Sequence, residues 1–208
     1  MLNIAVFGSG RGSNFIAILD AMQSGSIPNA RLRVVLSNNP DAGILRTAAS
    51  SSIPALHLSQ RQFRTEEEFA ARLLSVMNEY GVNFIVLAGY VKRLPSSVVG
   101  VFRNRIVNIH PALLPKYGGA GMYGMHVHEA VIASGDRVSG ATVHLVDEEY
   151  DRGAVVLQRE IEVMRGETAE SLAARVLEVE HELYPEVIRL FSEGRVVTTE
   201  DEVAVHPS

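Results

Sequence analysis

The chain opens with LNIAVFGSGRGSNFIAIL (residues 2–19), and this stretch decides the fold. Its apolar run, residues 2–7, leads through three alternating glycines into a segment whose apolar residues recur at helical spacing. A strand that passes through a glycine-rich turn directly into a helix is typical of α/β proteins with a parallel sheet. Glycines let backbone N–H groups approach a ligand, and the helix N-terminus adds positive partial charge. Residues 8–14 therefore predict more than a tight turn, namely a binding site for a phosphate group.

The motifs that this turn lacks narrow the kind of phosphate-bearing ligand that it binds. It has no Gly-Lys-Ser/Thr ending, which argues against nucleoside triphosphate hydrolysis, and it does not follow the Gly-x-Gly-x-x-Gly spacing. The next apolar run ends in Asn38-Asn39 and not in the acidic residue that would hold an NAD ribose. A phosphorylated small metabolite fits this turn better than a dinucleotide.

Short apolar runs and helical periods alternate along the rest of the chain. Further strands are predicted at Arg31–Ser37, Ala55–Leu58, Phe84–Leu87, Ile106–Ile109, Ala141–Val146 and Val155–Val163, and helices at Asn14–Met22, Gly43–Ser51, Thr65–Tyr80, Ser96–Phe102, His128–Ser134 and Thr168–Glu193. Pro111–Tyr123 is too rich in glycine and proline for regular structure, the last helix is expected to kink or break at Pro185, and one short strand is expected after Gly194. The pattern predicts a single-domain α/β fold over residues 1–208, a mostly parallel twisted sheet flanked by helices.

Composition and charge exclude several classes of protein. The 208 residues are 47% hydrophobic, enough for a sizeable core, and the formal net charge of −5 argues against a general nucleic-acid binder. The absence of cysteine excludes disulfides, thiolate nucleophiles and Cys-ligated metal sites. No apolar run approaches the roughly 18 residues of a membrane span, and the start of the chain is not that of a signal peptide. We expect a cytoplasmic protein that binds small molecules and neither nucleic acid nor membranes.

A second polar motif ends the strand predicted at Ile106–Ile109. Asn108 and His110 alternate along it, so they share a face at the carboxyl end of a predicted parallel strand, where open α/β sheets bind ligands. An amide N–H can stabilise a developing oxyanion, and an imidazole can move protons near neutral pH. A lone histidine at a strand end is more often structural, but the polar pair, Pro111 and the glycine-rich stretch together favour catalysis.

A third polar cluster, residues 147–151, follows the alternating strand that carries His144. One of its acids is expected to orient His110, as carboxylates commonly orient catalytic imidazoles, but the spacing does not say which one. His126 and His128 raise the possibility of a metal, yet the sequence has no His-Glu-x-x-His motif, and no Gly-x-Ser-x-Gly elbow follows a strand. We therefore expect neither a metal site nor a serine nucleophile.

Several motifs point to one family. The Asn-Ile-His-Pro-Ala-Leu-Leu-Pro segment (residues 108–115) resembles the folate-dependent formyltransferases in general. The Gly-Ser-Asn turn (residues 12–14) and the Glu-His-Glu-Leu-Tyr-Pro segment (residues 180–185) narrow the resemblance to the glycinamide ribonucleotide formyltransferases of purine biosynthesis. Further similarity lies in residues 86–90, 140–144 and 151–153, so that the resemblance covers nearly the whole chain.

The resemblance implies a Rossmann-like formyltransferase fold with a phosphate-binding half, about residues 1–105, and a catalytic and folate-binding half, about residues 106–208. It implies direct transfer of a formyl group from the cosubstrate 10-formyltetrahydrofolate to the amine of 5′-phosphoribosylglycinamide, through a tetrahedral intermediate and without a metal. A monomer or homodimer is expected. The implied residues are catalytic Asn108, His110 and Asp151; ribonucleotide-binding Arg11, Gly12, Ser13, Asn14 and Glu180; and folate-binding Val91, Lys92, Arg93, Leu94, Asn108, Asp147, Glu148, Glu149, Tyr150 and Asp151.

The chain departs from the family's pattern in three places. Gly118–Val127 is several residues longer than the family's short form, so its contacts do not carry over. Arg64 lies slightly early for the arginine that reaches the folate in many members, with Glu66 in register. Leu177 stands where some members carry a glutamine near the substrate.

Three other functions compete with this one. Formyltetrahydrofolate deformylase shares the Asn-x-His-Pro core but usually carries an N-terminal regulatory domain, for which a first strand at Leu2 leaves no room. Methionyl-tRNA formyltransferase usually carries a C-terminal barrel that meets tRNA, and the tail here is short and the charge unsuitable. The third alternative is a non-catalytic sugar-phosphate binding protein, in which Asn108 and His110 would have no catalytic role.

Overall fold

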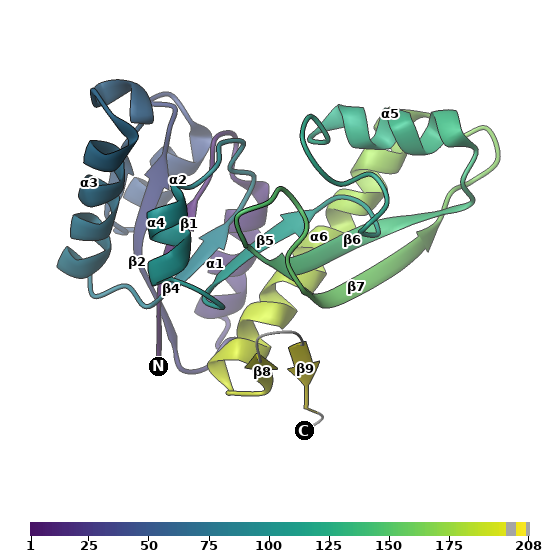
Figure 1. Ribbon diagram of the computed structural model, residues 1–208. Coiled ribbons are helices and arrows are strands. Elements are labelled where there is room, and N and C mark those ends of the chain that lie inside the picture. Colours follow the sequence, from purple (N-terminus) through teal and green to yellow (C-terminus); the bar gives the residue numbers. More distant parts are fainter. Residues whose placement is uncertain (199–202, 207–208) are drawn as a thin grey trace. The chain divides into compact units, whose positions relative to one another are not determined.

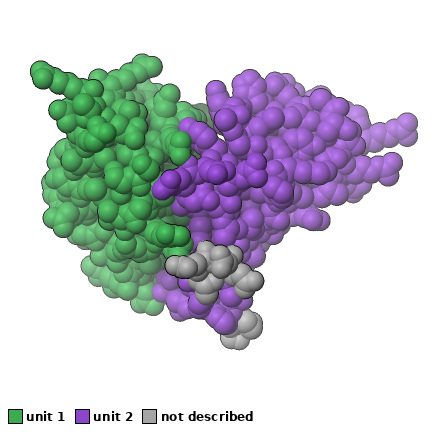
Figure 2. Space-filling view, in the orientation of Figure 1, with its two compact units in different colours: residues 1–107 green, residues 108–208 purple. Residues whose placement is uncertain are grey.

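The computed structural model describes residues 1–198 and 203–206 of the 208-residue chain. These residues form two compact units, residues 1–107 (unit 1) and the described part of residues 108–208 (unit 2), which Figure 2 colours separately. The strands are β1 (Leu2–Phe7), β2 (Ala30–Ser37), β3 (Ala55–His57), β4 (Phe84–Leu87), β5 (Ile106–His110), β6 (Val138–Leu145), β7 (Val155–Glu162), β8 (Val196–Thr198) and β9 (Val203–Val205). The helices are α1 (Ser13–Gln23), α2 (Gly43–Ser50), α3 (Glu66–Glu79), α4 (Ser96–Val101), α5 (Met125–Ser134), α6 (Ala169–Ser192) and a short 3-10 helix at Gln60–Gln62 (Figure 1).

Seven strands form one sheet in the order β3-β2-β1-β4-β5-β6-β7, and β8 and β9 form a separate two-stranded sheet. Strand β1 runs parallel to β2 and β4, and β2 runs parallel to β3, whereas β6 and β7 pair antiparallel. The prediction of an α/β fold with a mostly parallel sheet flanked by helices is confirmed.

The core of unit 1 lies around the parallel strands. All four residues of β4 and the last four of both β1 and β2 are buried, because helices cover both faces of a parallel sheet and its strands are apolar throughout. Helix α3 begins at Thr65, whose side chain accepts a hydrogen bond from the Glu68 N–H at 3.2 Å, while Glu68 Oε2 accepts one from the Arg64 N–H at 3.0 Å. These bonds satisfy two backbone donors at the helix start.

The core of unit 2 is built on β6 and α6. Helix α6 packs against β6, β7 and α5 in this unit (Figure 1). Seven of the eight residues of β6 are buried, whereas β7, beyond the buried Val156, alternates between half-buried and exposed positions, as an antiparallel strand with one solvated face does. The buried stripe of α6 includes Leu172, Val176, Leu183, Tyr184 and Val187. Among the described residues, no helix is long and apolar enough to cross a membrane.

The structure corrects three details of the sequence prediction. Helix α6 runs unbroken through Pro185, where a break was one expectation, because its apolar stripe continues to pack on both sides of the proline. The tail holds two paired strands, β8 and β9, where one was predicted. The 3-10 helix at Gln60–Gln62 was missed, and Ser59 and Gln62 close it with a reciprocal capping box. No described residue of 111–123 lies in a helix or strand, as predicted.

Candidate active site

The predicted phosphate loop lies in unit 1, where β1 turns into α1. Gly12 precedes the helix in the left-handed region at φ 86°, and a Cβ there would lie 2.8 Å from the Ile44 Cβ. A Cβ at Gly8 would lie 2.6 Å from the Ile44 Cδ1 and 2.9 Å from the Ala88 carbonyl oxygen. Packing against α2 therefore requires glycine at both positions. A Cβ at Gly10, by contrast, would meet no atom within 4 Å, so the fold itself gives no reason for that glycine.

Ser9 ties this loop to the ends of two neighbouring strands. Its hydroxyl donates to the Asn38 Oδ1 at 2.5 Å and accepts from the Val91 N–H at 3.0 Å, and its own N–H donates to the Gly89 carbonyl at 3.0 Å. Asn38, which occupies the place of an NAD-binding acid, thus holds the loop in shape. The helix begins with no side-chain cap, and the N–H groups of a first turn have no acceptor within their own helix. This arrangement suits an anion.

The stretch predicted to line the folate site within unit 1 differs from residue to residue. Val91 is half exposed, Lys92 and Arg93 are exposed, and Leu94 is buried at 3% exposure in the core of the unit. Leu94 therefore has a packing role as well as the predicted folate role. Arg11, on the exposed side of the phosphate loop, packs its backbone against Gly43, where a Cβ would lie 3.0 Å from the Arg11 carbonyl oxygen.

Four polar side chains meet in unit 2, and we call them the catalytic cluster: Asn108 and His110 on β5, His144 on β6, and Asp151 in the loop that follows β6. His110 Nδ1 lies 3.6 Å from the Asp151 Oδ2, and His144 Nε2 lies 3.5 Å from the Asp151 Oδ1. His144 Nε2 also lies 3.1 Å from the Asn108 Nδ2. The structure thus brings together all three residues predicted to be catalytic and adds His144 to them. Asp151 is the acid of residues 147–151 that faces His110.

The loop after β5 closes over this cluster through its backbone. His110 Nε2 lies 2.7 Å from the Tyr117 carbonyl oxygen, and the Gly119 N–H donates to the Asp151 Oδ2 at 3.0 Å. Between them, a Cβ at Gly118 would lie 3.2 Å from the Asp151 Cβ, so glycine lets the loop approach this closely. Tyr117 and Asp151 both have left-handed backbone conformations, at φ 56° and 54°. Such strain outside glycine gathers at functional sites.

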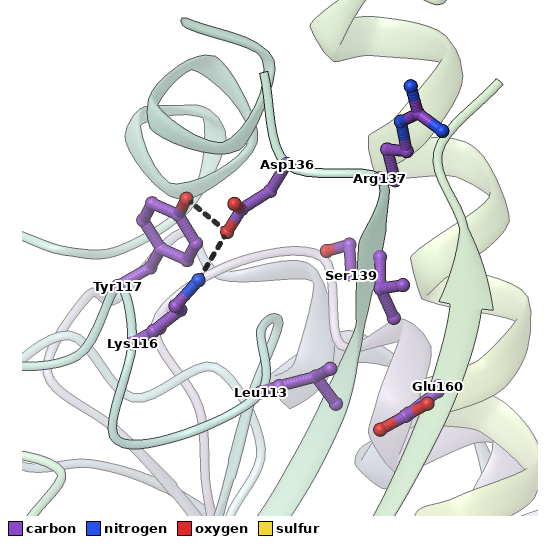
Figure 3. Close-up of a pocket in the computed structure, with 8 residues that line it drawn as sticks. Leu113, Lys116, Tyr117, Asp136, Arg137, Ser139 and Glu160 are labelled. Atoms are coloured by element: carbon purple, nitrogen blue, oxygen red, sulfur yellow. Dashed lines mark hydrogen bonds and ion pairs between the residues drawn. The ribbon is translucent and has the colours of Figure 1, made fainter. Parts of the chain in front are cut away.

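Tyr117 is held in place by its side chain. Its hydroxyl donates to the Asp136 Oδ2 at 2.8 Å, and Lys116 Nζ donates to the same oxygen at 2.9 Å (Figure 3). These residues form one wall of a cavity of about 360 Å³ within unit 2, whose other lining residues are Leu113, Arg137, Val138, Ser139 and Glu160. No residue of the catalytic cluster lines this cavity, and Tyr117 is the lining residue whose carbonyl contacts His110.

Hydrogen bonds to Thr142 and Gln158 fix the segment between β5 and Tyr117. Thr142 Oγ1 donates to the Ala112 carbonyl at 2.6 Å and accepts from the Leu114 N–H at 3.1 Å. Gln158 Nε2 donates to both the Thr142 Oγ1 and the Leu114 carbonyl, at 2.8 and 2.9 Å. After β6, a Cβ at Gly153 would collide with the Leu145 carbonyl oxygen, which explains the glycine two residues beyond Asp151. The backbone on both sides of the cluster is thereby fixed.

Burial and charge set the protonation of the cluster. Burial lowers the pKa of His110, and the Asp151 carboxylate and the Tyr117 carbonyl oppose that change only in part. Burial raises the pKa of Asp151, but the contacts with His144 and the Gly119 N–H and the charge of His110 outweigh it, so the net pKa is lowered. Asp151 is therefore ionised beside an imidazole that gives up its proton readily, which suits acid–base chemistry near neutral pH.

The remaining predicted residues of unit 2 lie in contrasting settings. Glu180 is buried on α6 at 8% exposure, an uncommon place for a carboxylate, whereas residues 147–150 are all exposed. Asp147 Oδ1 accepts a hydrogen bond from the Glu149 N–H at 2.8 Å, which shapes the turn. His126 is exposed and lies 3.5 Å from Glu129, while His128 is buried, so the two imidazoles of the His-x-His pair occupy different environments.

Sequence reasoning missed two members of the site. The contact of the Tyr117 carbonyl with His110 could not be predicted from the sequence, because every residue carries a backbone carbonyl. His144 did leave a signal, a single ionisable residue in a strand that is otherwise buried and largely apolar. The sequence does not show that His144 lies beside Asn108, because that contact depends on the order of the strands in the sheet.

Comparison with known proteins agrees with this geometry. Residues 2–188 match the formyl transferase family. Phosphoribosylglycinamide formyltransferase of Haemophilus influenzae is 40% identical over 94% of this chain and 90% of its own length. The chloroplastic phosphoribosylglycinamide formyltransferase of Vigna unguiculata is 42% identical over 96% of this chain, which spans 64% of that longer protein.

Solved structures give the same result. The crystal structure of glycinamide ribonucleotide transformylase 1 from Symbiobacterium toebii superposes with a TM-score of 0.92, at 38% identity, over the whole of this chain and 95% of that one. A formyltetrahydrofolate deformylase from Pseudomonas syringae shares the fold, with a TM-score of 0.86 but only 22% identity over 67% of its chain. The chain therefore belongs to the formyl transferase family, and the relatives that it matches closely are phosphoribosylglycinamide formyltransferases.

Proposed function

We propose that this chain transfers the formyl group of 10-formyltetrahydrofolate to the amine of 5′-phosphoribosylglycinamide, a step of de novo purine biosynthesis. The observation that carries the proposal is the buried contact of His110 with Asp151, together with the Asn108 amide, which contacts His144 next to Asp151. The activity printed in the names of its relatives supports it. The cytoplasmic location and the monomer or homodimer remain predictions, and light scattering during gel filtration tests the assembly.

The roles of the cluster follow from its chemistry. An N–H of the Asn108 amide donates to the formyl oxygen, on which negative charge develops when the amine nitrogen bonds to the formyl carbon. A donor of this kind contributes about 3–4 kcal/mol to the stability of the transition state. When His110 is protonated, its positive charge adds to the stabilisation of that oxygen. Asp151 supports that proton and helps to move the proton of the amine to the folate nitrogen, whose bond to the formyl carbon breaks.

The binding roles fall to other residues. In this proposal Gly12, Ser13 and Asn14 hold the ribose phosphate with backbone N–H groups, assisted by Arg11, and Glu180 lies near the glycinamide amine. Val91–Leu94 and Asp147–Asp151 receive the folate. The open space at Gly10 supports the phosphate role. Protein packing does not require glycine there, whereas a ligand that approaches the backbone does.

One assay separates the proposal from its alternatives. Deformylation of 10-formyltetrahydrofolate is followed by absorbance with and without 5′-phosphoribosylglycinamide, and we expect turnover only when the amine is present. Turnover that does not depend on the amine would identify a deformylase. Binding of the ribonucleotide without any turnover would identify a non-catalytic sugar-phosphate binding protein.

A further inference from the structure

His144 lies between Asn108 and Asp151, and the proposed function gives it no role of its own. Its side chain is buried at 2% exposure in the middle of β6. Its Nδ1 lies 2.8 Å from the Leu145 carbonyl oxygen, and its Nε2 lies 3.1 Å from the Asn108 Nδ2 and 3.5 Å from the Asp151 Oδ1. Both ring nitrogens therefore face protein groups.

The first of these contacts fixes the tautomer. A carbonyl oxygen can only accept, so Nδ1 carries the proton and donates it to Leu145. In the neutral ring Nε2 is then a lone pair, which accepts a hydrogen bond and donates none. Of its two neighbours, the Asn108 amide nitrogen is a donor and is also the nearer, whereas the Asp151 oxygen is an acceptor, to which Nε2 can donate only when the ring carries a second proton. The hydrogen bond runs from Asn108 to His144.

This bond selects one of two orientations of the Asn108 side chain. An asparagine amide fits a site in two ways that exchange its oxygen and nitrogen, and neighbouring groups decide between them. The opposite orientation would place the Asn108 oxygen against the lone pair of His144. In the observed orientation, one N–H of Asn108 serves His144 and the second remains to serve a ligand.

We propose that His144 is a positioning residue, which holds the Asn108 amide so that its second N–H faces the oxygen of the reacting formyl group. The inference rests on the proposed function for the identity of that oxygen. The orientation of the amide and the tautomer of His144 stand apart from it, and both can be measured without turnover.

The kinetic test compares two substitutions of nearly equal chemistry. The side-chain oxygen of His144→Gln reaches about as far as Nε2 and can accept from Asn108, whereas His144→Asn reaches only the place of Nδ1. We expect kcat within about tenfold of wild type for His144→Gln and a loss of about 10²-fold for His144→Asn, close to the effect of a lost oxyanion donor. KM for both substrates should change less than threefold, since Asn108 acts on the transition state.

A double variant tests whether His144 acts through Asn108. In the Asn108→Ala background, His144→Asn should lower kcat by no more than about threefold, because the amide that it positions is gone. Equal kcat for the Gln and Asn variants, or the full loss in the Asn108→Ala background, would overturn the proposal. Thermal unfolding of each variant excludes a loss of the fold as the cause.

An NMR spectrum of ¹⁵N-labelled histidine tests the tautomer of His144 independently of the proposed function. In protein labelled with ¹⁵N-histidine at neutral pH, the His144 signal, assigned by its absence in His144→Gln, should show a protonated Nδ1 and an unprotonated Nε2. A protonated Nε2 would overturn the inference even if the enzyme is active. A wild-type protein without formyl transfer would refute the proposed function, while this spectrum still decides the orientation of Asn108.

Discussion

The phosphate loop of unit 1 and the catalytic cluster of unit 2 are built in different ways. The loop is made from one short stretch of chain, and its shape depends on glycines that leave room for Ile44 and Ala88. The cluster collects side chains from β5, β6 and the following loop, and its shape depends on distances between residues far apart in the sequence. A site made of backbone groups is thus determined by a short stretch of sequence, whereas a site made of side chains forms only when the fold brings distant residues together.

The two regions also differ in electrostatics. The loop offers N–H groups and a helix start, whose partial charges do not titrate. The cluster contains an ionised carboxylate with a lowered pKa and a buried histidine whose pKa is lowered as well. Substitutions in the loop should therefore alter binding or stability, and substitutions in the cluster should alter the chemical step and its dependence on pH.

The largest expected effect is that of Asp151→Asn. We expect kcat to fall by roughly 10²–10⁴-fold, the usual contribution of an acid–base group, while the fold is preserved. The pKa of His110 should fall further, because the carboxylate that raises it is lost, and this is read from the pH profile of kcat.

Asp147→Asn is the matched control, because its carboxylate shapes the same loop and is not among the contacts of His110 that the structure shows. It should act mainly on folate affinity. Near-normal kcat in Asp151→Asn would mean that another acid of this loop supports His110.

The next effect concerns the stability of the loop. Gly12→Ala should lower the free energy of unfolding by about 1–3 kcal/mol, because the methyl group would press on Ile44 and the left-handed backbone disfavours alanine. Gly10→Ala should change it by less than about 0.5 kcal/mol, because its methyl group meets no protein atom. Urea unfolding measures both, and equal destabilisation by the two substitutions would contradict the distinction between packing glycines and the ligand-facing glycine.

A smaller effect is expected from charge at the loop. Ser13→Asp places a carboxylate at the start of α1, where it repels a bound phosphate. KM for the ribonucleotide should rise about tenfold, or about 1.4 kcal/mol, with kcat near wild type. Ser13→Asn, which has a similar size and no charge, serves as the control. A KM that is unchanged in the Asp variant would show that the phosphate binds elsewhere.

The smallest effect concerns acid stability, and it is confined to unit 2. Burial lowers the pKa of His110, His128 and His181 below the unfolded value of about 6.5. Because the unfolded chain then binds more protons, the stability from each neutral imidazole is present above that pH and is lost as the pH falls through the folded pKa. Asp151 stays ionised throughout this range, since its pKa is lowered from 3.8.

His128→Leu checks this expectation. Between pH 7.5 and 5.5 the variant should lose less of its free energy of unfolding than wild type, because one buried proton acceptor is gone. Urea unfolding at the two pH values gives the difference. An equal loss in both proteins would place the acid sensitivity in other groups.

The contrast between the regions also explains what the sequence could predict. The order of strands and helices followed from periodicity, and the phosphate loop followed from the three glycines, because both signals lie within a few neighbouring residues. Asn108 and His110 could be placed on one strand face for the same reason. The choice of Asp151 among the acids of its loop came from family resemblance, since four candidates within five residues are equivalent in sequence. Its left-handed backbone and its contact with Gly119 distinguish it only in three dimensions.

The central claim is that binding of the ribonucleotide and the chemical step belong to different regions. Calorimetric titration of 5′-phosphoribosylglycinamide into the Asp151→Asn variant tests it most directly, because this variant should have lost turnover. The account predicts a dissociation constant within about threefold of wild type. A dissociation constant that rises by the same factor as kcat falls would contradict it, and would show that Asp151 serves binding rather than chemistry.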